Sequence, residues 1–250
     1  MMRKGKYFLF VIGCCMILSS CARAPIAPIS VPTQMPSGAM RQDVCHIVGP
    51  GETIWRISKM YDVQMDDIAR ANNLKTLTEL EMGQRLTIPR AMPIKPVVSL
   101  YPSNKWKYII VHHSASDEGN ALDIYRAHRS RGWETVGYDF VIDNGSQGKV
   151  DGQIEACPRW TKQLDGAHCK AGGMNTQGIG ICLVGNFSQD AVSRKQMDSL
   201  VYLVNILRNY YTIPASNILG HGQVPGAKTE CPGTQFPWGD FRSKLNSESR

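Results

Sequence analysis

The sequence of 250 residues contains no apolar run near the roughly 20 residues that a membrane-spanning helix requires. It is also poor in charge, because Asp, Glu, Lys and Arg make up 20% of it, against 42% hydrophobic residues. This balance is typical of a globular chain and excludes a largely disordered one. No stripe of basic residues with interleaved aromatic side chains is present, so nucleic-acid binding is not expected.

Positive charge is concentrated at the start of the chain. The formal net charge is +7, and Arg3, Lys4 and Lys6 contribute to it just before an apolar stretch at residues 7–18. A basic start followed by an apolar stretch of this length is typical of a secretion signal. Without residues 1–20 the charge falls to about +4, a mild excess that suits an anionic polymer as partner.

The apolar stretch ends in Leu18-Ser19-Ser20-Cys21, which resembles the bacterial lipobox. That resemblance implies cleavage before Cys21 and a lipid on this cysteine, so the chain is expected to be exported and anchored to the cell envelope by lipid alone. If the host has an outer membrane, its periplasmic side is the expected place. An ordinary signal peptide is the alternative. Residues 21–44 contain four prolines and few large apolar side chains, which predicts a semi-rigid tether.

The other cysteines fit an exported protein. Two of the eight leave with the signal and one is the expected lipid site, which leaves Cys45, Cys157, Cys169, Cys182 and Cys231. Their odd number keeps at least one out of any intramolecular disulfide. The spacing of Cys157 and Cys169 allows a disulfide that closes a short loop, although spacing does not fix the pairing.

Residues 45–90 predict a small unit of two strands and two helices. A short strand and a glycine turn precede Thr53, which can cap a helix over residues 54–61. A second helix is expected at residues 65–72 and a closing strand at residues 85–88. A generic small α+β domain would share this order of elements.

Three motifs in this unit resemble a LysM module, a βααβ unit that binds glycans containing N-acetylglucosamine. They are Gly51-Glu52-Thr53-Ile54-Trp55, Ala71-Asn72-Asn73-Leu74 and Gly83-Gln84-Arg85-Leu86. The resemblance implies that glycan lies between residues 51–54 and the second loop.

A linker with three prolines is expected at residues 91–104, a larger domain at residues 105–246 and a tail at residues 247–250. Strands are expected at residues 108–112, 138–142, 148–150 and 178–184, the last of them central because it is almost wholly apolar. Helices are expected at residues 122–131, after a capping box at residues 193–196, and at residues 239–245. The alternation predicts an α/β fold with a mixed central sheet and helices on its faces.

Three residues of this domain are candidate metal ligands. His112 ends a predicted strand, His221 follows the apolar Ile218-Leu219-Gly220, and Cys231 comes ten residues later. A catalytic zinc uses three protein ligands of these types and leaves a fourth position for water. Spacing alone does not separate this site from structural histidines and a buried thiol.

Residues 107–238 resemble the amidase family that phage-type lysozymes with amidase activity share with animal peptidoglycan recognition proteins. The matching stretches are Ile109-Ile110-Val111-His112-His113-Ser114, Gly132-Trp133, Val136-Gly137-Tyr138-Asp139-Phe140, Gly166-Ala167-His168, the run from Gly178 to Phe187, and Gly220-His221 with Cys231-Pro232-Gly233. The resemblance implies a Zn²⁺ site of His112, His221 and Cys231, with His113 structural or behind the ligands.

The resemblance also implies the reaction, hydrolysis of the amide bond between N-acetylmuramic acid and L-alanine in peptidoglycan by a zinc-activated water. Tyr138 would act on the oxyanion or the water, and either Lys228 or Thr229 would be a second donor. His168 is expected to line the substrate groove. Trp133 is expected to stack on substrate, with core packing as the alternative.

Two other functions remain open, a non-catalytic peptidoglycan receptor and a tether that joins envelope to wall. Receptors of this family without activity lack the cysteine ligand, so Cys231 favours an enzyme. A glutamate found in the central strand of cytoplasmic relatives is replaced here by Cys182, which is expected to be a core thiol. The sequence does not indicate an oligomeric state.

Overall fold

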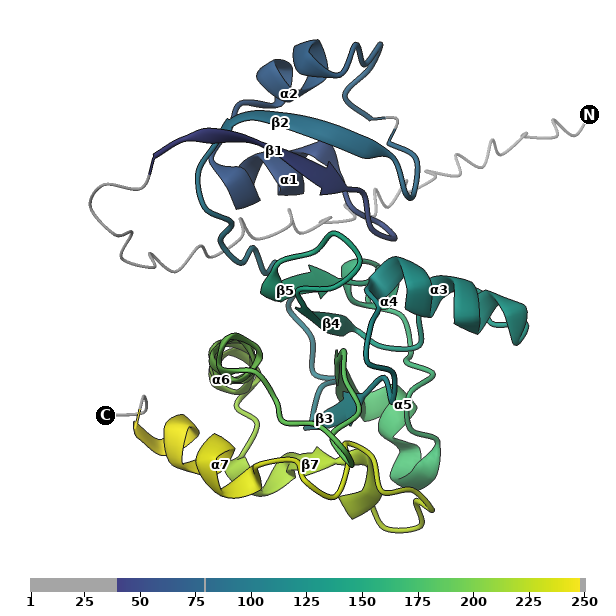
Figure 1. The fold of residues 1–250 in the computed structure, drawn as a ribbon. Coiled ribbons are helices and arrows are strands. Elements are labelled where there is room, and N and C mark those ends of the chain that lie inside the picture. The colour runs from purple at the N-terminus through teal and green to yellow at the C-terminus, as the bar shows by residue number, and fades with distance from the viewer. Residues whose placement is uncertain (1–39, 79, 248–250) are drawn as a thin grey trace, which may run out of the picture.

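The computed structural model describes residues 40–78 and 80–247, which form a small and a large domain (Figure 1). The predicted signal, Cys21 and most of the tether lie outside the described residues. Within the described ranges, no helix combines the length and hydrophobicity needed to cross a membrane.

The small domain has the predicted βααβ order. Its elements are β1 (Gln42–Ile47), α1 (Ile54–Tyr61), α2 (Met65–Ala71) and β2 (Arg85–Ala91), with β1 and β2 antiparallel. Thr53 caps α1 as predicted, because its side chain accepts a hydrogen bond from the Arg56 amide. Asn72 joins α2 to β2, since its side chain exchanges two 2.7 Å hydrogen bonds with the Thr87 backbone.

The large domain is built on a five-stranded sheet in the order β5-β4-β6-β3-β7. Its strands are β3 (Tyr108–His113), β4 (Phe140–Asn144), β5 (Asp151–Ala156), β6 (Gly178–Leu183) and β7 (Ile218–Gly220). All pairs are parallel except β4 with β5, so the predicted mixed sheet is confirmed. β6 is buried at every residue and lies in the centre, as its apolar sequence predicts.

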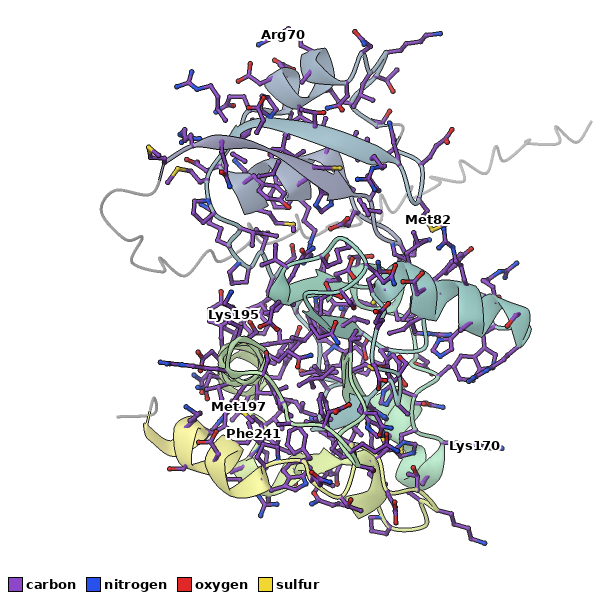
Figure 2. The ribbon with its side chains drawn as sticks, viewed as in Figure 1. Arg70, Met82, Lys170, Lys195, Met197 and Phe241 are labelled. Atoms are coloured by element: carbon purple, nitrogen blue, oxygen red, sulfur yellow. The ribbon has the colours of Figure 1, made fainter. Side chains whose placement is uncertain are left out.

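Helices cover both faces of the sheet. They are α3 (Ala121–Ser130), α4 (Pro158–Thr161), α5 (Met174–Gln177), α6 (Arg194–Tyr211) and α7 (Trp238–Ser247). The helices α6 and α7 lie on one side, where Met197 and Phe241 point into the main core, whereas Lys195 of α6 is exposed (Figure 2). The opposite face packs against α3 and α5, and the candidate site opens on it.

Two predictions are wrong. Residues 148–150 are not a strand, because they belong to the turn between β4 and β5, where Gln147 and Gly148 both have positive φ. Cys157 and Cys169 do not form a disulfide, and both are free buried thiols. They pack in separate apolar clusters, Cys157 near α3 and Cys169 beside Met174 of α5.

Candidate metal centre and active site

The three predicted metal ligands come together at one edge of the sheet. His112 lies near the end of β3, and His221 follows directly after β7, which pairs in parallel with β3. Cys231 reaches the same place from the loop before α7. One ligand atom from each side chain lies within 4.8 Å of the others. Parallel neighbouring strands explain why residues so distant in sequence meet here.

The distances suit a zinc ion. The Sγ of Cys231 and the Nδ1 of His112 are 3.6 Å apart. Zinc bonds of about 2.3 Å to sulfur and about 2.0–2.1 Å to nitrogen, at a tetrahedral angle, place these two atoms about 3.5–3.6 Å apart. The residues present therefore fit the metal, with Nδ1 as the ligand atom of His112.

His168 fixes the tautomer of His112 that this coordination needs. The Nε2 of His168 donates to the carbonyl oxygen of Gly178 at 3.1 Å, which leaves its Nδ1 as an acceptor. That Nδ1 lies 3.1 Å from the Nε2 of His112, which must therefore carry the donated proton. Burial lowers the pKa of His168 to about 4 and that of His112 well below its usual value, so both rings are neutral. The Nδ1 lone pair of His112 is then free for a metal.

The prediction that His168 lines the substrate groove is wrong, since its side chain is 0% exposed. Two glycines make room for the ring. A Cβ at Gly166 would lie 2.4 Å from the imidazole, and one at Gly180 would lie 2.5 Å from it. These glycines were visible in the motifs, but sequence alone did not show that they flank a histidine behind a metal ligand.

Cys231 and His113 have different roles in the cluster. The backbone amide of His113 donates to the Sγ of Cys231 at 3.4 Å. Burial raises the pKa of the Cys231 thiol to about 12, so a thiolate there requires a nearby cation. The ring of His113 turns away, and its Nδ1 accepts from the Phe187 amide at 3.2 Å. His113 therefore supports the site through its backbone and is not a member of the ligand cluster.

Tyr138 borders the cluster as a protonated phenol. Its ring centroid lies 5.1 Å from that of His112, and its ring packs against the apolar cluster that contains Cys182, the β6 residue paired with His112. Burial, and then the nearby thiols of Cys182 and Cys231, raise the pKa of Tyr138 well above its usual value. Cys182 is fully buried, as expected of a core thiol. Tyr138 can thus donate a hydrogen bond at neutral pH.

The loop before Tyr138 is held by His128 of α3, whose Nδ1 accepts from the Gly137 amide at 2.9 Å. The ring of Trp133 packs against the same imidazole at a tilt of 45°, with 4.4 Å between the ring centroids, and Trp133 is half-buried. Part of the Trp133 surface therefore packs within the protein, and its contact with substrate stays a prediction.

Lys228 and Thr229 are both exposed on the loop that leads to Cys231. The Oγ1 of Thr229 accepts from the Cys231 amide at 3.1 Å, so Thr229 shapes the backbone at this ligand. The role of either residue as a donor to an oxyanion stays a prediction.

A buried acid behind the cluster was not foreseen from the sequence. Asp139 is 0% exposed, its Oδ2 accepts from the Gly180 amide at 2.8 Å, and the same oxygen lies 4.0 Å from the Nε2 of His168. Burial raises its pKa to about 7. Asp139 thus ties β6 to the loop that carries Tyr138.

Two segments of the chain match known families. Residues 102–234 match the N-acetylmuramoyl-L-alanine amidase family, and residues 46–89 match the LysM domain. The endolysin of Enterobacteria phage T3 is 35% identical over 144 residues, which cover 54% of this chain and 85% of the endolysin. The endolysin of Enterobacteria phage K11 is 31% identical over 130 residues, which cover 49% of this chain and 77% of that endolysin.

Peptidoglycan-recognition protein 2 of Holotrichia diomphalia is 30% identical over 108 residues, and the chain spans about half of that protein, 52%. Among solved structures, N-acetylmuramoyl-L-alanine amidase LysC from Clostridium intestinale is 33% identical. The match covers 58% of this chain and 89% of LysC, with a TM-score of 0.48.

Proposed function

Since the chain belongs to the N-acetylmuramoyl-L-alanine amidase family, we propose that it hydrolyses the bond between N-acetylmuramic acid and L-alanine in peptidoglycan. One observation carries the proposal: His112, His221 and Cys231 converge beside a half-buried, protonated Tyr138. A non-catalytic receptor or a wall tether would need neither the complete ligand set nor the hydrogen bonds that orient it.

His112, His221 and Cys231 would hold Zn²⁺, which supplies an activated water and polarises the substrate carbonyl when bound. His168 keeps His112 in the tautomer that presents Nδ1. The His113 amide stabilises negative charge on the Cys231 sulfur through its hydrogen bond. These contacts hold the ligands in place before a metal or substrate arrives.

Tyr138 would donate its hydroxyl hydrogen bond to the oxyanion that forms when the amide carbonyl is attacked, or would orient the attacking water. Its high pKa keeps the donor proton in place at any physiological pH. Packing of the Tyr138 ring against the cluster that contains Cys182 keeps it beside His112. Lys228 or Thr229 would add a second donor from the facing loop.

The LysM match supports glycan binding by the small domain, so we propose that this domain holds the polymer while the large domain cuts the peptide from it. Acylation of Cys21 and anchoring at the cell envelope are further proposals, supported by the sequence of residues 1–21. Cys21→Ser should release unprocessed or soluble protein. A Cys21→Ser protein that stays membrane-bound in a lipid-labelled, processed form would contradict the anchor.

The direct test of the reaction is incubation of purified protein with intact sacculi, with and without a metal chelator. Without chelator, we expect new α-amino groups of L-alanine and no new reducing sugar ends. With chelator, we expect the protein to lose its metal and product formation to stop. Reducing ends would indicate a glycosidase and would contradict the proposed reaction. Tight wall binding without any cleavage would favour the receptor.

A further inference from the structure

Residues 94–100 of the segment between the two domains are buried or half-buried throughout, although the prolines of this segment predict a linker. The Lys95 amide donates to the Met60 carbonyl at 3.0 Å, and the Trp160 indole donates to the Ser99 carbonyl at 2.8 Å. Val97 is buried in the core of the small domain, whereas the next residue, Val98, is buried in the core of the large one. Two adjacent residues in two different cores leave no free chain between the domains.

A buried ion pair of the large domain lies at this boundary and contacts the small domain. Lys149, in the turn between β4 and β5, lies 2.7 Å from the Oε2 of Glu155, and both side chains are almost fully buried. The same Nζ donates to the carbonyl oxygen of Ile47 in the small domain at 2.9 Å. On the other side, Glu52 bonds the Nε2 of His46 at 2.9 Å and accepts from the Gly49 amide at 2.6 Å.

The charges of this cluster depend on both domains. Burial alone would lower the pKa of Lys149, but Glu155, Glu52 and Asp143 outweigh it and raise that pKa. Burial alone would raise the pKa of Glu52, but His46 and Lys149 outweigh it and lower that pKa. A buried Lys149 would therefore lose one of its counter-charges if the small domain moved away.

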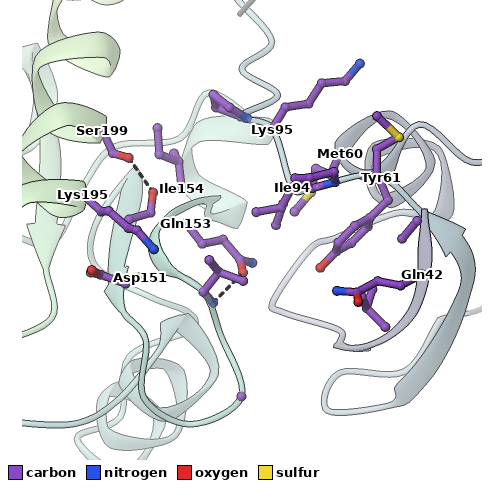
Figure 3. Close-up of a pocket in the computed structure, with 18 of the residues that line it drawn as sticks. Gln42, Met60, Tyr61, Ile94, Lys95, Asp151, Gln153, Ile154, Lys195 and Ser199 are labelled. Atoms are coloured by element: carbon purple, nitrogen blue, oxygen red, sulfur yellow. Dashed lines mark hydrogen bonds between the residues drawn. The ribbon is translucent and has the colours of Figure 1, made fainter. Parts of the chain in front are cut away.

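At the domain boundary, Gly49 of the small domain and Gly148 of the large domain lie too close to the other domain for a larger residue to fit. A Cβ at Gly49 would lie 2.6 Å from the Oε2 of Glu155, and one at Gly148 would lie 2.7 Å from the Cδ1 of Ile47. Beside the ion cluster the domains leave a cleft of about 540 Å³, lined by Tyr61 on one side and by residues such as Gln153 on the other (Figure 3). Docking therefore rests on the ion cluster and the packed connecting segment.

The cluster also reaches the catalytic domain's own machinery. The Oε1 of Glu155 accepts from the Ala121 amide at 2.7 Å and so holds the first residue of α3. The same helix carries His128, which holds the loop of Tyr138. The acid that pairs with Lys149 at the boundary thus also fixes the helix that borders the active site.

We propose that the LysM module is docked as a fixed part of the catalytic unit, by Lys149 and Glu155, and is not a freely moving tethered domain. The turn at residues 48–52 is then a domain-docking surface. This docking covers part of the surface beside residues 51–54 that the LysM resemblance assigns to glycan, because Gly51 lies against Pro158 of the large domain. Glycan would then contact the small domain mainly at the exposed loop of residues 73–78 and would meet the active site in a fixed orientation. Presentation of glycan in this way rests on the proposed glycan binding, whereas the docking itself does not.

Hydrogen exchange of the full chain, followed by mass spectrometry, tests the docking without reference to activity. We expect residues 92–99 to be protected, and Lys149→Met to speed exchange about tenfold or more in residues 46–52, 92–99 and 119–123. Exchange in α6 should not change, which would show that the variant is folded. Lys149→Arg keeps the charge and should restore most of the protection.

The matched control is Lys162→Met, which removes an exposed lysine next to α4 and should leave every segment unchanged. Residues 92–99 exchanging like an unstructured linker in the parent chain would overturn the proposal. So would a folded Lys149→Met protein with unchanged exchange at the domain boundary. Neither result would bear on the proposed amidase reaction, which the sacculus assay tests separately.

Discussion

At the scale of single residues, the metal site depends on a side chain behind the ligands, because His168 sets the tautomer of His112. His112, His221 and Cys231 stand out because histidine and cysteine at strand ends and loops are suited to zinc. His168 could not be placed in the same way, because its role depends on two long-range contacts, with His112 and with the Gly178 carbonyl. Such contacts follow from the packing of β3 against β6 and leave no periodic pattern in the sequence.

His168→Ala should weaken zinc affinity about 10- to 100-fold, because His112 would lose the partner that sets its tautomer. His168→Gln should recover part of that affinity, since an amide can accept from His112 and donate to Gly178. Competition with a chelating dye measures both variants. Equal zinc affinity for His168→Ala and the parent protein would show that His168 only fills space.

Asp139 predicts a pH dependence of stability. Burial raises the pKa of Asp139 from 3.8 to about 7 in the folded protein. Between pH 3.8 and pH 7, Asp139 therefore keeps its proton in the folded protein and has lost it in the unfolded chain. Its contribution to stability is therefore fully present below about pH 4 and is lost as the pH rises through about 7.

Asp139→Asn keeps an oxygen for the Gly180 amide but removes the charge. The stability of this variant relative to the parent should therefore rise between about pH 4 and pH 8, by up to a few kcal/mol, and then level off. Denaturant unfolding at several pH values measures the difference. A difference that stays constant across this range would contradict the raised pKa.

At the scale of elements, the sequence predicted most helices and strands because their signals are local. The apolar run of β6 and the cap of α1 are examples. The strand β5 was predicted at residues 148–150, before its actual position at Asp151–Ala156. Residues 148–150 belong instead to a turn, in which Gln147 and Gly148 have positive φ. Turn geometry depends on the partner strand, which the sequence does not show.

The capping box of α6 gives a prediction at this scale. Ser193 accepts from the Gln196 amide, and the Gln196 side chain accepts from the Ser193 amide. Ser193→Ala should therefore cost about 1 kcal/mol of folding stability and leave zinc content unchanged, because α6 lies on the face opposite the metal cluster. Thermal unfolding measures the cost, and loss of zinc in a folded variant would argue against this separation of the two faces.

At the scale of the whole molecule, the sequence predicted two domains but not their relation. Proline-rich composition at residues 91–104 favours a linker, and composition alone cannot show that Val97 and Val98 enter different cores. The burial of Lys149, Glu155 and Glu52 could not be predicted from the sequence either, because charged residues are usually exposed. The two domains therefore share more buried contacts than two modules joined by a flexible linker would.

We propose that a zinc site of His112, His221 and Cys231 performs amide hydrolysis with Tyr138 as hydrogen-bond donor. The most direct measurement is zinc content beside the rate of L-alanine amino-group release from peptidoglycan, for Cys231→Ala and Tyr138→Phe. Cys231→Ala should lose zinc and activity together. Tyr138→Phe should keep zinc and lose about 100- to 1000-fold in rate, because only the donor hydroxyl is removed. Full zinc and full rate in the Cys231→Ala protein would contradict the account.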